Sequence, residues 1–204
     1  MNTAKKLEDL KAILAESGSA VIALSGGTDS TYLVSVAASR PGLHLLAVTV
    51  STPYMFSSEV RDAASFCSEI GVKHKELIAG IPLSVMSNPP DRCYLCKREI
   101  MNLITSEARK GGYKVIFDGT NADDLKEHRP GLRALGESGV RSPLAEAGLT
   151  KEEIRYLARE AGLEVSDRPS NSCLLTRFPH DMAITPENVS DRKSTRLNSS
   201  HTIQ

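Results

Sequence analysis

The 204-residue sequence has few aromatic residues, 4% in all, and no tryptophan, so aliphatic side chains must form most of its core. It also has no excess of either charge, because 25 Lys and Arg residues balance 25 Asp and Glu residues. A neutral chain gives no general electrostatic reason to bind nucleic acid or an acidic membrane surface. No apolar run approaches the roughly 18–20 residues of a membrane span, and the N-terminus lacks a signal-peptide core. We therefore expect a cytoplasmic protein that binds neither nucleic acid nor membranes.

Cysteine is scarce as well, with four residues in the chain. Without a secretion signal, these thiols are expected to be reduced rather than to form a disulfide framework. Cys67 lies in a helical pattern and is expected to be a core residue. Cys93 and Cys96 have the spacing of half a zinc or cluster site, but the sequence indicates no partners for them. A structural or supporting role is therefore the favoured interpretation of this pair.

Short apolar runs alternate with helical periodicities along most of the chain. The expected strands are 20–24, 43–50, 73–78 and 114–117. The expected helices lie near 7–14, 30–38, 59–70, 91–109 and 151–161, the last preceded by capping-box spacing. This alternation predicts an α/β fold with a doubly wound, mostly parallel sheet and helices on both faces. Polar segments follow three of the strands, at 25–30, 49–54 and 118–121, so we expect them to share one pocket at the carboxyl edge.

The segment Ser25-Gly26-Gly27-Thr28-Asp29-Ser30 joins an expected strand to an expected helix. Its glycines let backbone N–H groups approach an anion, and the helix N-terminus adds partial positive charge. The three hydroxyls can donate to phosphate oxygens, and Asp29 can hold Mg²⁺ or fix the loop. The segment is neither a Walker A loop nor a Gly-x-Gly-x-x-Gly fingerprint. The structural alternative is a tight turn with a polar cap.

A second polar segment runs from Asp118 to Asp124. Gly119 permits a sharp exit from the strand, and Thr120 and Asn121 are candidate ligands of phosphate or ribose. Asp123 is a candidate Mg²⁺ ligand, because hard cations prefer carboxylate oxygens. An ordinary turn is the competing interpretation of this segment.

Cys173 follows a polar, proline-containing loop and stands between Arg168 and Arg177. A lone cysteine is most often a small buried apolar residue. Nearby cations, however, lower the pKa of a thiol and favour the nucleophilic thiolate. The two arginines therefore make Cys173 a candidate nucleophile.

These motifs together resemble a known enzyme family. Residues 25–30 match the Ser-Gly-Gly-x-Asp-Ser loop of the PP-loop ATPases, and Asp118-Gly119-Thr120-Asn121 is similar to a second segment of that superfamily. With the blocks at 88–97 and 142–144 and the spacing of Pro169, Cys173 and Arg177, the chain resembles LarE-type ATP-dependent sacrificial sulfur transferases over about residues 5–190. The resemblance implies that a carboxylate of a pyridinium mononucleotide is adenylated, with ATP split into AMP and pyrophosphate. Cys173 would then give up its sulfur, leaving dehydroalanine and a thiocarboxylate on the way to a nickel-pincer cofactor.

The resemblance also implies a set of site residues, the cofactors ATP and Mg²⁺, and homo-oligomers among full-length relatives. The implied ATP-binding residues are Ser25, Gly26, Gly27, Thr28, Asp29, Ser30, Thr49, Gly119, Thr120 and Asn121. Candidate substrate or phosphate ligands are Arg129, Arg168 and Arg177, and candidate Mg²⁺ ligands are Asp29 and Asp123. Some relatives carry a cysteine-bound iron–sulfur cluster instead. The sequence has one cysteine around position 173, which favours the sacrificial version.

We expect an ATP-binding domain over 1–165, the start of a truncated sulfur-transfer segment over 166–191, and a foreign, disordered tail over 192–204. Such a chain is expected to bind ATP but to transfer sulfur poorly. Two alternatives stay open. One is another PP-loop adenylating enzyme, such as a tRNA thiolation enzyme or the synthetase domain of an amidotransferase. The other is a non-catalytic ATP-binding module.

Overall fold

A computed structural model of the protein describes residues 2–127, 129–168 and 173–200. Its centre is a four-stranded, all-parallel sheet of β1 (Ser19–Ala23), β2 (His44–Ser51), β3 (Lys73–Ile78) and β4 (Val115–Phe117). The strand order is β3-β2-β1-β4, so the chain moves outward from β1 and then returns to its other side. The carboxyl ends of β1 and β4 thus flank the topological switch point, where ligands bind in such sheets.

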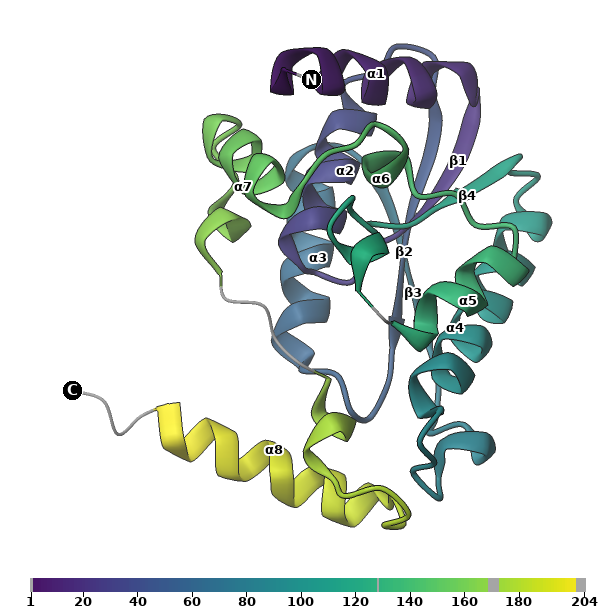
Figure 1. Ribbon diagram of the computed structural model, residues 1–204, viewed down its shortest axis with the longest axis vertical. Helices are drawn as coiled ribbons and strands as arrows, with labels where there is room; N and C mark the ends of the chain where they lie inside the picture. Colours follow the sequence, from purple (N-terminus) through teal and green to yellow (C-terminus); the bar gives the residue numbers. More distant parts are fainter. Residues whose placement is uncertain (1, 128, 169–172, 201–204) are drawn as a thin grey trace.

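Helices cover both faces of this sheet (Figure 1). The longer ones are α1 (Thr3–Glu16), α2 (Thr28–Ala38), α3 (Ser57–Glu69), α4 (Arg92–Lys110), α5 (Pro130–Glu137), α7 (Lys151–Glu160) and α8 (Pro186–Ser200). The shorter ones are α6 (Pro143–Glu146) and the 3-10 turns η1 (Leu83–Val85), η2 (Asp124–Lys126), η3 (Glu164–Asp167) and η4 (Leu174–Arg177). The predicted doubly wound α/β fold with helices on both faces is confirmed.

The alternation of side chains along the strands divides the core into two layers. Ala20 and Ile22 of β1 pack with α1, α2, α3 and α7 on one face. Val21, between them, packs on the opposite face with Met101 of α4 and Leu135 of α5. Because both faces are buried, the central strands are nearly continuous apolar runs, which is the pattern that made them predictable.

A third apolar cluster lies beyond the sheet and joins the C-terminal segment to the region before α4. It includes Tyr54, Val85, Leu174 and Phe178. Asn88 connects the two sides, because its side-chain amide donates to the carbonyls of Phe178 at 3.1 Å and Pro179 at 2.6 Å. Asn88 is fully buried and has a φ of 51°, which asparagine tolerates better than most residues. The segment that begins at Cys173 is thus attached to the start of α4.

In the structure α8 continues to Ser200, into the segment from residue 192 for which the sequence predicts disorder; the predicted division of the chain stays a prediction. Its start is fixed by reciprocal bonds, since Thr185 Oγ1 accepts from the Asn188 N–H and Asn188 Oδ1 accepts from the Thr185 N–H. No glycine or proline interrupts residues 187–200. The rest of the proposed tail, 201–204, lies outside the described residues.

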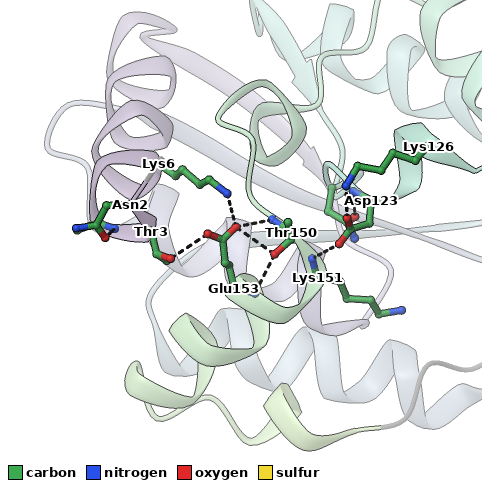
Figure 2. A network of polar contacts seen from close by, with 10 residues as sticks. Asn2, Thr3, Lys6, Asp123, Lys126, Thr150, Lys151 and Glu153 are labelled. Atoms are coloured by element: carbon green, nitrogen blue, oxygen red, sulfur yellow. Dashed lines mark hydrogen bonds and ion pairs between the residues drawn. The ribbon is translucent and has the colours of Figure 1, made fainter.

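The capping box of α7 is confirmed and extends into a small network (Figure 2). Glu153 accepts hydrogen bonds from Lys6 at 2.6 Å, from Thr3 at 2.9 Å and from the Thr150 N–H at 2.9 Å. Burial alone raises the pKa of Glu153, but these bonds outweigh it and lower the pKa to about 2 from the ordinary 4.5. The network fastens α1 to the first turn of α7. No helix in the described part of the chain has the length and apolar content to cross a membrane.

Glu153 should make the stability of the protein depend on pH. Its pKa is lower in the folded state, so its contribution is fully present above about pH 4.5 and is lost as the pH falls towards 2. We expect the unfolding free energies of wild type and Glu153→Gln to differ most above pH 4.5 and to converge below it. Denaturant unfolding between pH 3 and 7 measures this difference. Glu152→Gln is the control on the same turn and should keep the pH dependence of wild type. If its unfolding free energy instead lost pH dependence as much as that of Glu153→Gln, the assignment to Glu153 would be contradicted.

Candidate active site

A cavity of about 800 Å³ opens at the carboxyl edge of the sheet, where β1, β2 and β4 end. Several sequence-predicted residues line it together: Ser25 to Ser30, Gly119, Thr120, Arg129, Arg168 and Cys173. The predicted shared pocket is therefore present, and the 49–54 segment contributes Val50 to its lining. The lining also includes residues whose role the sequence did not indicate: Cys93, Lys97, Lys151 and Arg155.

Two glycines allow the backbone to form the floor of this cavity. Gly26 has a φ of +78°, and a Cβ there would lie 2.9 Å from the Glu59 carbonyl oxygen of α3. A Cβ on Gly119 would lie 2.8 Å from the backbone nitrogen of Ser30. The residues that follow β4 therefore pack directly against the first turn of α2. The first N–H groups of a helix have no intrahelical partner, so this turn offers donors to an anion.

The hydroxyl groups of the loop are not all directed at the cavity. Ser25 Oγ and Ser30 Oγ lie 3.1 Å apart, and Ser30 also donates to the Gly27 carbonyl. Thr28 donates to the Val165 carbonyl in η3 at 2.7 Å. The expectation that Thr28 binds phosphate through its hydroxyl is thus not supported, because that group attaches the loop to η3.

Asp29 is held by its neighbours and retains one free oxygen. Asn121 donates its side-chain amide to Asp29 Oδ2 at 3.0 Å. Asp29 Oδ1 is buried and has no hydrogen-bond partner among the described residues. Burial raises the pKa of Asp29 and the charge of Asp124 adds to this, whereas the Asn121 bond lowers it. A buried carboxylate oxygen without a partner fits Mg²⁺, which takes one or two protein carboxylates together with phosphate oxygens.

Asn121 and Asp123 have structural roles in this arrangement. Asn121 Oδ1 accepts from the N–H groups of Asp123 and Asp124, so this residue orients Asp29 from a position that is 1% exposed. Asp123 bonds Lys126 and the N–H of Lys151, and it does not line the main cavity. Asp123 therefore does not fit the predicted Mg²⁺ role, and Asp124 is the carboxylate that lies beside Asp29.

Thr49 lies beneath the site rather than in it. Its hydroxyl donates to the Leu24 carbonyl at 2.8 Å and lies 2.9 Å from His74 Nε2. Burial lowers the pKa of His74, which favours the neutral ring in this contact. Thr49 is 1% exposed and stabilises the edge between β1 and β2, so the structure does not support its prediction as an ATP contact.

Cys173 lines the cavity, but its surroundings differ from those expected. Burial of the thiol raises its pKa, an effect that the Leu175 N–H opposes and the nearby Cys96 and Cys93 reinforce. Arg92 is the cation that lowers this pKa. Arg168 instead binds Asp62 at 2.6 Å, and Arg177 is exposed outside the cavity lining. Neither flanking arginine is among the main causes of this pKa shift, so the predicted effect of Arg168 and Arg177 on the thiol stays a prediction.

The fold brings the Cys93-x-x-Cys96 pair to the neighbourhood of Cys173. Cys93 lines the same cavity, and Cys96 Sγ lies 3.0 Å from the Tyr54 hydroxyl. Burial and the neighbouring thiols raise the pKa of Tyr54, which keeps its hydroxyl protonated. Within the described residues, no three Cys, His, Asp or Glu side chains are close enough together to hold a metal ion. Cys173 is the one cysteine in its own stretch of sequence, and the fold brings this pair near it from a distant part of the chain.

The charged residues of the cavity differ in whether they already have partners. Arg129 pairs with Asp124 at 2.8 Å and with Glu127, and Arg168 pairs with Asp62. Lys151 and Arg155, by contrast, have no carboxylate partner among the described residues. The sequence did contain a signal for this pair. Lys151 and Arg155 are four residues apart in a helix that a capping box predicts, so both lie on one face of α7.

Comparison with known proteins agrees with these features. A family model described as asparagine synthase matches residues 14–128. The pyridinium-3,5-bisthiocarboxylic acid mononucleotide synthase of Lactiplantibacillus plantarum is 31% identical over 193 residues, which cover 91% of this chain and 68% of the relative.

Two solved structures share the fold. An NMN synthetase from Francisella tularensis is similar with a TM-score of 0.66 and 18% identity, over 96% of this chain and 87% of its own. A tRNA thiolase from Methanococcus maripaludis, solved with its 4Fe–4S cluster, has a TM-score of 0.57 and 18% identity, over 97% and 75%. With its Ser-Gly-Gly-x-Asp-Ser loop at the switch point of a parallel sheet, the chain belongs to the PP-loop ATPases and, within them, to the LarE-type family.

Proposed function

We propose that the protein adenylates a carboxylate of a pyridinium mononucleotide with ATP and then transfers sulfur from Cys173 to it. The observation that carries this proposal is that Cys173 and the Ser25–Ser30 loop line one cavity. A carboxylate activated at the loop would thus lie in the same cavity as the thiol. The synthase name of the L. plantarum relative supplies the substrate class.

In the first step, a substrate carboxylate oxygen attacks the α-phosphorus of ATP, and pyrophosphate leaves. The N–H groups at the start of α2 hold the phosphates, and Asp29, positioned by Asn121, would hold Mg²⁺ with Asp124 beside it. When bound, Mg²⁺ would neutralise charge on the phosphate oxygens. The activated acyl phosphate is thereby ready for displacement of AMP.

In the second step, the Cys173 thiol loses its proton, and the sulfur attacks the acyl carbon while AMP leaves. The carbon–sulfur bond of the cysteine then breaks after removal of its α-proton, so the electrons stay on sulfur. The products are a substrate thiocarboxylate and dehydroalanine at position 173. Because burial raises the pKa of Cys173, deprotonation is the step that rising pH should favour.

A second candidate is sulfur transfer from a cluster bound by Cys93, Cys96 and Cys173. The observation that favours it is the proximity of the three thiols, because Cys96 and Cys93 raise the pKa of Cys173 and Cys93 raises that of Cys96. The thiolase from M. maripaludis shows that this fold can carry a 4Fe–4S cluster. As placed in the structure, the three sulfur atoms are not at metal-binding distances. We therefore favour Cys173 itself as the donor.

A single-turnover experiment separates the two candidates. The protein is incubated with ATP, Mg²⁺ and the pyridinium dicarboxylate mononucleotide, and its intact mass is measured. We expect AMP to form and Cys173 to lose about 34 Da, the mass of H₂S. Unchanged mass with repeated turnover, together with iron and labile sulfide in anaerobically purified protein, would establish the cluster instead. Formation of ADP would contradict adenylation in either version.

A further inference from the structure

Cys96 is a nucleophilic side chain that the favoured version of the reaction does not use. It lies near the start of α4 and packs against the third apolar cluster, which contains Leu174 and Leu175. These two residues follow Cys173 directly and are 1% and 2% exposed, so the backbone after Cys173 is fixed in the cluster that Cys96 contacts. Burial is the main cause of the raised pKa of Cys173, and among the neighbouring thiols Cys96 contributes more to it than Cys93 does.

Tyr54 connects the two cysteines. Its hydroxyl lies 3.0 Å from Cys96 Sγ, and its ring belongs to the same apolar cluster as Leu174. Burial raises the pKa of Tyr54, and the charges of Cys96 and of Cys173 add to this effect. The hydroxyl therefore stays protonated and can donate to the sulfur of Cys96, which stabilises that sulfur when it acts as a nucleophile. Tyr54 is 4% exposed, so the position of Cys96 Sγ is constrained by a buried partner.

The other two cysteines are less well placed to reach position 173. Cys67 is fully buried in the apolar layer that α1, α2, α3 and α7 share with the sheet. Cys93 lines the cavity, but Cys96 is the one cysteine among the described residues of the third apolar cluster. Cys96 is therefore the thiol that the fold holds beside the residues that follow Cys173.

The proposed sulfur transfer leaves an electrophile at this position. Loss of the sulfur converts Cys173 to dehydroalanine, whose Cβ is conjugated with the peptide carbonyl and accepts nucleophiles such as thiols. The departure of the sulfur atom also leaves room beside the apolar cluster for another sulfur to approach. A thiol that is fixed next to such a carbon reacts at a far higher effective concentration than a free thiol in solution.

We propose that Cys96 adds to the spent residue 173 and closes it as a lanthionine thioether. This inference rests on the proposed sacrifice of Cys173. In the step, the S–H bond and the C=C π bond break, Cys96 Sγ bonds to Cβ of residue 173, and the thiol hydrogen goes to its Cα. No atom leaves, and no oxidant or reductant is required. The thioether joins α4 permanently to the C-terminal segment, so a spent chain cannot take up a new sulfur at this position.

The test examines the protein after one turnover with ATP, Mg²⁺ and the mononucleotide. The chain is unfolded, treated with 2-mercaptoethanol and, after removal of that reagent, alkylated with iodoacetamide. Loss of the mass of H₂S tests the proposed function, whereas the later steps test the cross-link, which leaves the mass unchanged. We expect most spent chains to take up no mercaptoethanol and to have one alkylated thiol fewer than open dehydroalanine would leave. Proteolysis should release two peptides joined between positions 96 and 173.

Two outcomes would overturn the inference in different ways. Spent chains that take up mercaptoethanol and yield no joined peptides would contradict the cross-link while sulfur transfer from Cys173 stands. An unchanged intact mass, with no loss of H₂S, would remove the proposed sacrifice and the cross-link together.

Two variants identify the thiol that adds. Cys96→Ser should lose the same mass but stay open and take up mercaptoethanol, because a serine hydroxyl is a much weaker nucleophile than a thiol. Cys93→Ser is the matched control from the same helix and should form the cross-link as wild type does. A peptide joined through Cys93 in wild type, or loss of the cross-link in Cys93→Ser, would contradict the assignment to Cys96.

A second measurement needs no turnover. Dibromobimane becomes fluorescent when it joins two neighbouring thiols, and it should bridge Cys96 and Cys173 in the Cys93→Ser protein. The bridge should disappear when Cys173→Ala is added to that variant. If the Cys93→Ser protein forms no bridge, Cys96 and Cys173 are not neighbours, and the inference fails whatever the mass experiment shows.

Discussion

Replacing Cys173 with alanine should abolish sulfur transfer while ATP is still cleaved to AMP and pyrophosphate. The substitution leaves the loop and Asp29, with its bond from Asn121, unchanged, so the activation step keeps its residues. The displacement step loses its sulfur, and removal of a nucleophile of this kind lowers rates on the order of 10³-fold or more. Thiocarboxylate formation, followed by mass spectrometry of the product, measures the loss. The adenylate should then hydrolyse, so AMP forms without the sulfur product.

Cys93→Ser is the companion variant, because Cys93 lines the same cavity. If Cys173 is the donor, this variant should retain most of the single-turnover yield. If a cluster is the donor, Cys93→Ser should lose sulfur transfer as completely as Cys173→Ala does. Sulfur transfer by Cys173→Ala at more than about one per cent of the wild-type yield would contradict both versions, since both require this thiol.

Replacing Gly119 with alanine should damage both stability and nucleotide binding. The added Cβ would lie 2.8 Å from the Ser30 nitrogen and 2.9 Å from its Cα, and backbone atoms cannot rotate away. Overpacking of this kind costs about 1–3 kcal/mol and moves the backbone. The part that moves is the first turn of α2, where the phosphate donors lie. We expect a lower midpoint in denaturant unfolding and at least a tenfold loss of MgATP affinity.

Gly136→Ala is the control for this substitution. Gly136 lies in α5, and a Cβ there would have no neighbour within 4 Å. Alanine is a better helix former than glycine, so this variant should be as stable as wild type or more so by up to about 1 kcal/mol. A Gly119→Ala protein with wild-type stability and MgATP affinity would show that β4 and α2 are not as tightly packed as described.

The sequence predicted the fold well because its local patterns and its long-range structure agree. Buried parallel strands such as β1 are continuous apolar runs, and helices such as α7 begin with a capping box that forms as expected. The glycine loop was recognisable because its chemistry depends on the backbone, which six consecutive residues determine. These features can be recognised in the sequence without knowing which residues lie on the other side of the cavity.

The remaining features of the site depend on contacts between distant segments. Cys93 and Cys96 meet Cys173 because Asn88 attaches the C-terminal segment to the start of α4, a contact that spacing along the chain does not reveal. The partner of Arg168 could not be predicted for the same reason, since Asp62 comes from α3.

The bond from Thr28 to the Val165 carbonyl has a thermodynamic consequence. It joins the loop that would bind ATP to η3, which comes before Cys173 in the chain. A ligand that shifts either element must carry the other along or break the bond, so the two positions are energetically coupled. Such coupling is reciprocal. If bound ATP changes the affinity of a ligand beside Cys173 by some factor, that ligand changes the affinity for ATP by the same factor.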